Sequence, residues 1–185
     1  TYLHLRGLGT PKEGRLAAGE VHMRQAIADK PDYAEAYYNL AGVLAAEGRR
    51  EEAVRQYENA LRVKPDFPGA EFNLANTLDD LGRGEEAVVH YEAALRLDPN
   101  NPEAEYNLGN ALALLHRPAD AVAHYEAALR LRPNYPEAEN NLGSAFFETG
   151  RLADARSHYE AALRLDPNFS DARQNLARLS AAGPP

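Results

Sequence analysis

The octapeptide HYEAALRL occurs at residues 90–97, 124–131 and 158–165, and QYENALRV at residues 56–63 is a fourth variant of it. Each copy begins 34 residues after the copy before it. Aligned on this block, full units begin at Ala34, Pro68, Pro102 and Pro136, and the second and third units agree at 21 of 34 positions. A fixed period of this kind predicts a repeat array, in which small structural units stack side by side and build an extended surface.

Each unit carries two apolar patterns of helical period that are separated by a turn, which predicts a helical hairpin. A glycine in the turn, such as Gly82, ends the first helix because it adopts a left-handed conformation at little steric cost. In the third unit His116 replaces this glycine and Pro118 follows it, so we expect a less regular turn there. A proline also ends each second helix, because it lacks the N–H and clashes with the preceding turn. These prolines are Pro65, Pro99, Pro133 and Pro167.

A 34-residue helical hairpin with a leucine and a small residue in its first helix, here Leu108 and Gly109, resembles the tetratricopeptide repeat (TPR). The second helix agrees, with Ala121, Tyr125 and Pro133 at the family's small, aromatic and terminating positions. The resemblance implies an all-α fold, a right-handed α–α superhelical solenoid of TPR hairpins. The tyrosine of each second helix is expected to be buried between helices; these are Tyr57, Tyr91, Tyr125 and Tyr159.

The repeat register divides the chain into six expected segments. Full units cover residues 34–67, 68–101, 102–135 and 136–169, which exceeds the minimum of about three that a stack requires. Residues 1–33 are expected to form a degenerate or truncated first unit, and residues 170–185 a capping helix and tail. The capping helix should cover the last hairpin, whereas the opposite end is less protected. We therefore expect any weak end-to-end self-association to involve residues before Tyr33.

Composition limits the classes of partner. The chain has 28 Asp and Glu against 20 Lys and Arg, a formal net charge of −8, which argues against nucleic acid or an anionic membrane as the main partner. The longest apolar run, residues 111–115, is too short to insert across a bilayer. The absence of cysteine excludes disulfides and leaves the compartment open. We expect a cytoplasmic protein, and because the chain starts at Thr1, an upstream targeting segment is compatible with the sequence.

The sixth residue of every unit is asparagine, which is a poor helix former and therefore indicates a structural partner or a ligand. This ladder consists of Asn39, Asn73, Asn107, Asn141 and, in the final part-unit, Asn175. The ninth residues Asn76 and Asn110 share the same stripe, which we expect to line a concave groove. A carboxamide can both donate to and accept from the main chain of an extended peptide. The alternative is that these amides bond to neighbouring helices and persist through repeat duplication.

The TPR resemblance adds a role for the ladder. An asparagine at this position commonly contacts the ligand backbone in TPR proteins, and the long ladder resembles the TPR domain of the protein O-linked N-acetylglucosamine transferases. The basic residues of TPR modules that clamp acidic chaperone C-termini are absent from the matching positions. Beside the ladder, the fifth residues Tyr38, Phe72 and Tyr106 are candidate apolar anchors for a partner. We expect loop packing for the aromatic residues that end the loops, which are Phe67, Tyr135 and Phe169.

The histidines are the strongest hint of chemistry in the chain. Four of them, His22, His90, His124 and His158, share one repeat position, which holds Gln56 in the first full unit. Packed helices lie about 8–10 Å apart, so two of these rings are not expected to meet one zinc ion at about 2.1 Å. His116 and His124 are separated by Pro118, which interrupts a common helix. Phosphate-binding loops, zinc-protease motifs and nucleophile elbows are absent. We therefore expect no catalytic residue, metal or cofactor.

The sequence thus predicts a protein-interaction scaffold that binds an extended, neutral or basic peptide segment in an asparagine-lined groove and is not itself an enzyme. One alternative is the substrate-selecting arm of a larger enzyme such as a glycosyltransferase. Another is a self-assembling scaffold. The identity of the partner does not follow from the sequence, because a few variable groove residues determine it.

Overall fold

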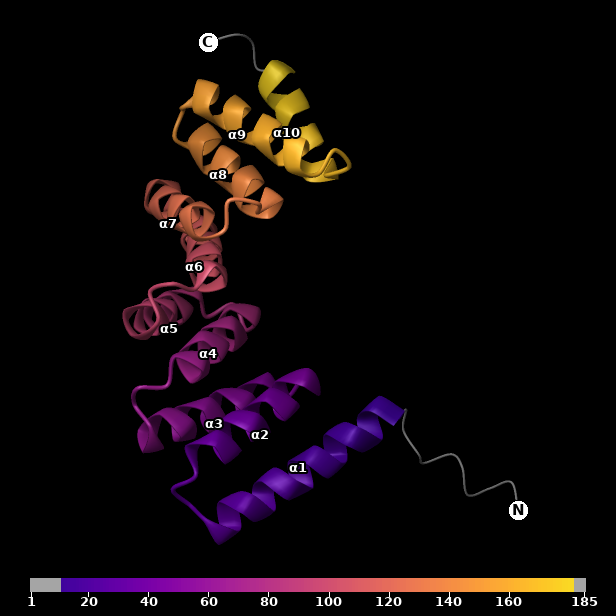
Figure 1. Cartoon of the computed structure of the whole chain (residues 1–185), viewed down its shortest axis with the longest axis vertical. Helices are drawn as coiled ribbons and strands as arrows, with labels where there is room; N and C mark the ends of the chain where they lie inside the picture. The colour runs from indigo at the N-terminus through magenta and orange to yellow at the C-terminus, as the bar shows by residue number, and fades with distance from the viewer. Residues whose placement is uncertain (1–10, 182–185) are drawn as a thin grey trace, which may run out of the picture.

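The computed structural model describes residues 11–181, which form a single row of helical hairpins without any strand (Figure 1). The first helices of the four hairpins are α2 (Ala34–Ala46), α4 (Pro68–Asp80), α6 (Pro102–Leu114) and α8 (Pro136–Glu148). Their second helices are α3 (Arg50–Val63), α5 (Gly84–Leu97), α7 (Pro118–Leu131) and α9 (Leu152–Leu165). Helix α1 (Pro11–Asp29) precedes the hairpins and α10 (Ser170–Ala181) follows them. The all-α superhelical fold predicted from the sequence is confirmed.

Within each hairpin, small residues let the two helices approach and a tyrosine fills the space between them. The four tyrosines of the second helices are at most 3% exposed, so their predicted burial is confirmed. In the third hairpin the Tyr125 ring lies directly on Gly109, where an added Cβ would come within 2.6 Å of the ring. Each second helix also packs against the next first helix, which makes every hairpin depend on its neighbours for burial.

The turn of the third hairpin corrects one expectation from the sequence. His116 adopts a φ of 58°, close to the 73° of Gly82 at the equivalent position. The hydrogen bond that closes the turn is also the same length, 2.9 Å from Arg117 N to Leu112 O and 2.9 Å from Arg83 N to Leu78 O. The turn is therefore regular, and His116 adopts a left-handed conformation that costs a non-glycine residue about 1–2 kcal/mol.

Helix α1 packs against α2 and takes the place of a preceding repeat. Met23 and Ile27 are partly buried against the core, and Glu20 accepts a hydrogen bond from Arg49 in the turn after α2 at 2.8 Å. Arg49, and after it Arg24, lowers the pKa of the Glu20 carboxyl. The structure describes side chains only from Gly19 onward, and residues 1–10 of the first expected segment lie outside the described residues.

Helix α10 covers the other end of the row. It contacts α9 and α8, and it buries Ala172 and Leu179 against the last hairpin at 0% and 2% exposure. Its outward side carries Arg173 and Arg178, both exposed. This is the arrangement expected of a polar cap on a solenoid, although the end of the expected tail, residues 182–185, lies outside the described residues.

Candidate functional site

The asparagine ladder is linked from repeat to repeat by side-chain hydrogen bonds. Asn107 Nδ2 donates to Asn76 Oδ1 at 2.9 Å, and the same oxygen accepts from the Tyr91 hydroxyl at 2.7 Å. One repeat later, Asn141 Nδ2 donates to Asn110 Oδ1 at 2.9 Å. The ninth residue therefore joins the tyrosine of its own hairpin to the asparagine of the next. The side of the array on which this occurs, formed by the first helices, is called the ladder face below.

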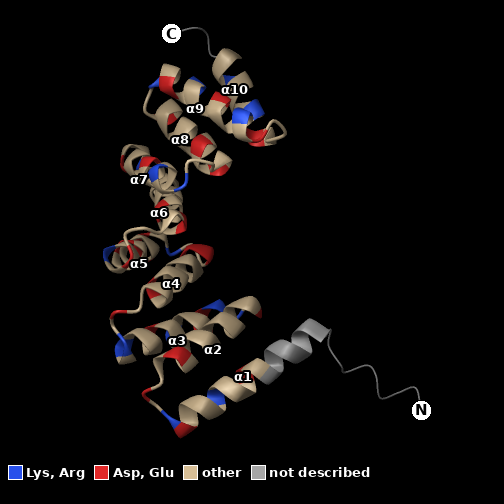
Figure 2. Ribbon diagram, viewed as in Figure 1, with Lys and Arg blue, Asp and Glu red and all other residues tan. Residues whose placement is uncertain are grey.

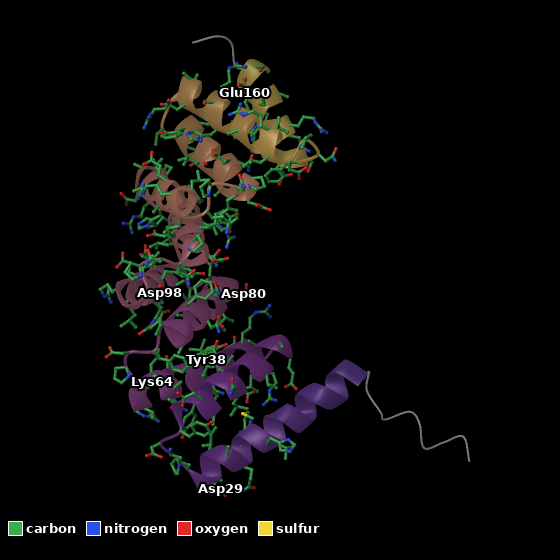
Figure 3. The ribbon with its side chains drawn as sticks, in the orientation of Figure 1. Asp29, Tyr38, Lys64, Asp80, Asp98 and Glu160 are labelled. Carbon is green, nitrogen blue, oxygen red and sulfur yellow. The ribbon has the colours of Figure 1, made fainter. Side chains whose placement is uncertain are left out.

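The fifth residue of the preceding repeat provides a second acceptor for the ladder. Asn73 Nδ2 donates to the Tyr38 hydroxyl at 2.9 Å, and Figure 3 shows Tyr38 where the first hairpin meets α4. Asn175 Nδ2 donates at 3.0 Å to Asn140 Oδ1, because the fourth unit has asparagine at this position instead of an aromatic residue. Phe72 has no hydroxyl, so Asn107 has only the acceptor on Asn76.

These bonds favour the structural alternative for one N–H of Asn73, Asn107 and Asn175. In Asn141 the whole amide is engaged, because its Nδ2 donates to the Tyr106 hydroxyl at 3.1 Å and to Asn110 Oδ1 at 2.9 Å, and its Oδ1 accepts from Asn140 Nδ2 at 3.1 Å. The amides of Asn73 and Asn107 are used only in part. Within the described residues, no donor to Asn73 Oδ1 or Asn107 Oδ1 is recorded, and the exposed Asn39 side chain has no hydrogen-bond partner there. Each carboxamide offers two N–H donors and an accepting oxygen, so unused polar capacity remains along the ladder face.

The aromatic residues at the fifth position mainly hold the repeats together. The Tyr38 ring packs on Phe67 with centroids 4.9 Å apart, and Tyr106 packs on Tyr135 at 4.8 Å. The expected loop packing of Phe67 and Tyr135 is therefore confirmed. Phe72 lies 6.1 Å from the Tyr91 ring by centroid. All three fifth-position aromatic side chains are half-buried, so only part of each ring is accessible to a partner.

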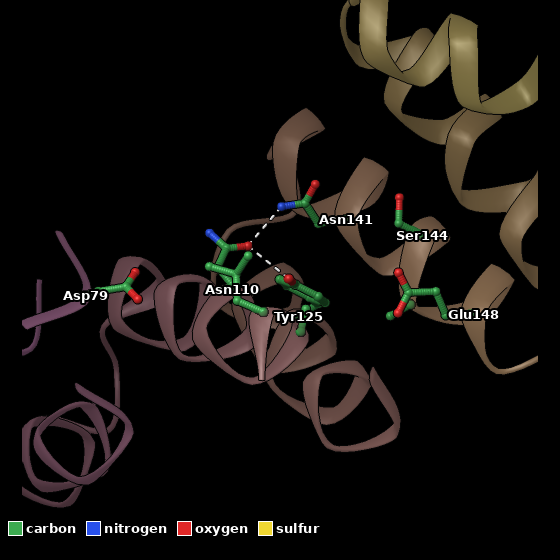
Figure 4. Close-up of a pocket in the computed structure, with 9 residues that line it drawn as sticks. Asp79, Asn110, Tyr125, Asn141, Ser144 and Glu148 are labelled. Carbon is green, nitrogen blue, oxygen red and sulfur yellow. Dashed lines mark hydrogen bonds between the residues drawn. The ribbon is translucent and has the colours of Figure 1, made fainter. Parts of the chain in front are cut away.

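A hollow of about 430 Å³ opens on the ladder face across three consecutive first helices, α4, α6 and α8 (Figure 4). We call it the central hollow. Its lining residues are Asp79, Asn110, Ala113, Leu114, Tyr125, Asn141, Ser144, Ala145 and Glu148. Of the predicted site residues, Asn110 and Asn141 line this hollow, whereas the other ladder and aromatic residues lie elsewhere. Asn110 Oδ1 accepts hydrogen bonds from both the Tyr125 hydroxyl and Asn141 Nδ2, so these three groups form a fixed polar part of its wall.

Seven of the nine residues that line the central hollow were not among the predicted site residues, and Asp79, Leu114 and Glu148 are the three of them that carry a charge or a large exposed apolar side chain. Asp79 lies on α4, Leu114 on α6 and Glu148 on α8, so each of the three helices contributes one of them. Burial, and after it the neighbouring Asp80, raises the pKa of the Asp79 carboxyl. Leu114 is 73% exposed, more than any other large apolar side chain in the described part of the chain. The sequence contained one signal for this site, because Leu114 stands at a repeat position that holds Ala46, Asp80 and Glu148 in the other units.

Figure 2 shows that charged residues of both signs are mixed along the described part of the chain, whose formal net charge over the full sequence is −8. Several arginines pair with a carboxylate three residues ahead, including Arg83 with Glu86 at 2.6 Å and Arg117 with Asp120 at 2.8 Å. In residues 11–181, no helix has the length and apolar character needed to cross a membrane.

Comparison with known families agrees with this geometry. Models described as tetratricopeptide repeat or TPR repeat match residues 34–67, 76–115 and 106–169. These matches lie on the hairpins described above, and the chain belongs to the tetratricopeptide repeat family. No curated protein sequence matches it.

Several solved structures are similar to this chain. YrrB, described as a TPR protein with an unusual peptide-binding site, is 28% identical with a TM-score of 0.79, and the match covers 86% of this chain and 82% of YrrB. MamA from Desulfovibrio magneticus RS-1 is 26% identical with a TM-score of 0.78, covering 80% and 84%. The first TPR of Spaghetti (RPAP3), bound to the HSP90 peptide SRMEEVD, is 29% identical with a TM-score of 0.61, covering 62% and 91%.

Proposed function

We propose that this chain is a protein-interaction scaffold that holds an extended segment of a partner protein against the ladder face, across the central hollow. The observation that carries this proposal is the hollow itself. It has the volume of an ordinary ligand pocket, which is about 300–1,000 Å³, and it runs across successive repeats, as an extended segment would. Its wall combines apolar surface with a few fixed polar groups, which is the usual composition of a binding site.

The ladder supplies contacts to the main chain of the bound segment. The second N–H and the Oδ1 atom of Asn73 and of Asn107 are the groups available for this purpose, whereas both N–H groups of Asn141 are already engaged. A peptide main chain presents alternating N–H and C=O groups, so such contacts do not depend on the side chains of the partner. Tyr38, Phe72 and Tyr106 have a smaller role in this proposal than the sequence suggested, because their rings already pack within the array.

The comparisons support a binding role. YrrB has a peptide-binding site and the Spaghetti repeat is bound to a peptide, and every family model that matches this chain is a TPR model. The charge of the chain favours a neutral or basic partner segment, since the central hollow includes two carboxylates. Affinity should then fall modestly as the salt concentration rises, because exposed charges are screened.

A peptide selection with a matched pair of variants tests the proposal. Peptides are selected from a displayed random library on the whole chain, and their affinities are measured for Leu114→Arg and Val89→Arg. Both substitutions replace an exposed apolar residue, 73% and 56% exposed respectively, but only Leu114 lines the central hollow. We expect Leu114→Arg to abolish binding and Val89→Arg to preserve it. Equal binding by both variants, with melting temperatures like that of the parent, would place the site elsewhere.

A further inference from the structure

We propose that the central hollow selects a segment with an apolar residue flanked, two residues away on each side, by lysine or arginine. The apolar side chain covers Leu114, and the two cations face Asp79 and Glu148. This inference rests on the proposed function and specifies the chemistry of the bound segment. It depends on the arrangement in Figure 4, where Asp79 and Glu148 lie at opposite ends of the hollow.

The apolar position follows from Leu114. This side chain is 73% exposed and lies on α6, the middle helix of the three, beside Ala113. An exposed leucine inside a hollow gains free energy when a partner covers it, at about 25 cal/mol for each Å² of apolar area removed from water. Since the other full units have alanine or an acid at this position, the exposed leucine occurs once among the four units, on the middle helix of the hollow.

The basic positions follow from the two carboxylates. Within the described residues, neither Asp79 nor Glu148 has a recorded ion pair, whereas the adjacent Asp80 pairs with Arg50 at 3.0 Å. The half-buried Asp79 has lost part of its hydration without a compensating cation, in agreement with its raised pKa. A cation from outside restores that interaction, because an opposite charge stabilises the ionised form.

Three of the chain's own arginines, at the hairpin turns, are already paired, whereas Arg178 on α10 donates to Asn175 Oδ1 at 3.5 Å and has no carboxylate partner among the described residues. The arginines at the turn of the second, third and fourth hairpins each contact a carboxylate on their own second helix, at 2.6–2.8 Å. They are Arg83, Arg117 and Arg151. The cations that complement Asp79 and Glu148 are therefore expected from the partner. An acidic segment would instead be repelled by both carboxylates.

The spacing follows from the geometry of helices and extended chains. The first helices α4, α6 and α8 follow one another along the ladder face, with α6 between the other two. An extended peptide rises about 3.3 Å per residue, and residues i, i+2 and i+4 point to the same side. Basic residues at i and i+4 therefore span about 13 Å, and their flexible side chains supply the remaining reach to the two carboxylates. The residue at i+2 then faces Leu114.

Two peptides of identical composition test the spacing. One is acetyl-Ser-Lys-Ser-Leu-Ser-Lys-Ser-amide, and the other is acetyl-Ser-Ser-Lys-Leu-Lys-Ser-Ser-amide, in which the lysines point away from the leucine side. A third peptide has glutamine in place of both lysines of the first. Each is titrated into the whole chain, and binding is followed by NMR on the Leu114 methyl groups and the side-chain amides of Asn110 and Asn141. We expect the first peptide to bind roughly five- to tenfold more tightly than either other peptide, the effect of two partly exposed ion pairs.

The double variant Asp79→Asn, Glu148→Gln should remove this preference. Its matched control is Glu126→Gln, Glu160→Gln, which removes two exposed carboxylates from second helices and should leave the preference intact. The melting temperature of the control should equal that of the parent, and that of the Asp79→Asn, Glu148→Gln variant should be no lower, because none of these residues has an ion pair within the described residues and Asp79 is half-buried without a cation. Equal binding of all three peptides on the ladder face would overturn the spacing while leaving the proposed function standing. The absence of any shift at Leu114 would overturn this inference, and the library selection would then decide the proposed function independently.

Discussion

His124 Nδ1 lies 2.8 Å from Glu105 Oε2, which joins α7 to α6 within one hairpin. Since an ionised carboxylate only accepts, the ring donates through its Nδ1–H. The pair recurs as His90 with Glu71 and as His158 with Glu139, both at 2.6 Å. In the first unit, the same two positions hold Tyr37 and Gln56. The two positions therefore change together within this chain, and the recurring histidine is explained by a partner in its own repeat.

This pairing predicts that His124→Ala destabilises the array, because the Glu105 side chain is only 16% exposed and would lose its donor. Leaving such a group unsatisfied costs about 1–3 kcal/mol, measurable as a lower urea midpoint. The double change Glu105→Tyr, His124→Gln copies the first unit and should cost less than His124→Ala alone. An open surface depression of about 350 Å³ beside this pair leaves room for the tyrosine ring, which is larger than the glutamate side chain that it replaces. If the double variant is the less stable of the two, the positions do not act as an exchangeable pair.

The ladder predicts different costs for the same substitution at two of its positions. Asn141→Ala removes bonds to the Tyr106 hydroxyl and to Asn110 Oδ1, with an expected loss of about 1–3 kcal/mol for the two bonds. Asn39 is exposed, so Asn39→Ala should be neutral or slightly stabilising because alanine is the better helix former. Urea unfolding of both variants provides the measurement. Equal effects at the two positions would mean that the inter-repeat bonds contribute nothing to stability.

The fold was predictable from the sequence because the period, the glycine and proline positions and the buried tyrosines all specify the same hairpin. The role of the asparagines could not be predicted, since the carboxamide of a residue such as Asn107 can hydrogen-bond equally well to a neighbouring helix or to a ligand. Only the positions of Asn76 and Tyr91 in space show that one N–H is already engaged. For the same reason, replacing Asn73, Asn107 and Asn141 together by alanine would change stability as well as binding.

The central hollow was missed for a different reason. Alignment of the units emphasises positions that repeat, whereas Asp79, Leu114 and Glu148 stand where the units differ. Their proximity results from the stacking of three first helices, which brings together residues 34 or more positions apart. The regular turn at His116 was not predicted, because histidine does not favour a left-handed conformation. The packing of the hairpin nevertheless imposes this conformation on His116.

The strained turn predicts that His116→Gly stabilises the protein. Glycine adopts the observed φ of 58° without the cost of about 1–2 kcal/mol that a side chain incurs, so the melting temperature should rise by a few degrees. Gly82→Ala at the equivalent turn is the reverse control and should lower it, since Gly82 has a φ of 73°. A decrease in the His116→Gly variant would indicate a stabilising contact of the imidazole that outweighs the strain.

The buried tyrosines predict a loss of stability at alkaline pH. Burial raises the pKa of Tyr57 to about 12, and burial also raises the pKa values of Tyr91, Tyr125 and Tyr159. Because these folded-state values lie above the unfolded value of about 10, the corresponding stability is fully present below pH 10. It is lost as the pH rises from about 10 through 12 and beyond, since the unfolded chain then releases protons more readily than the folded one.

Phenolate absorbance and far-UV circular dichroism, recorded together during a titration with base, provide the measurement. The buried tyrosines should ionise in one cooperative step that coincides with the loss of helix. Tyr125→Phe should shift that step to higher pH, because one ionising group is removed from the unfolded state. The same variant should lower stability at neutral pH by about 0.5–1.5 kcal/mol, since it deletes the 2.9 Å bond to Asn110. Ionisation of every tyrosine near pH 10 with the helices intact would contradict their burial, because a neutral hydroxyl between packed helices cannot release its proton at its ordinary pKa.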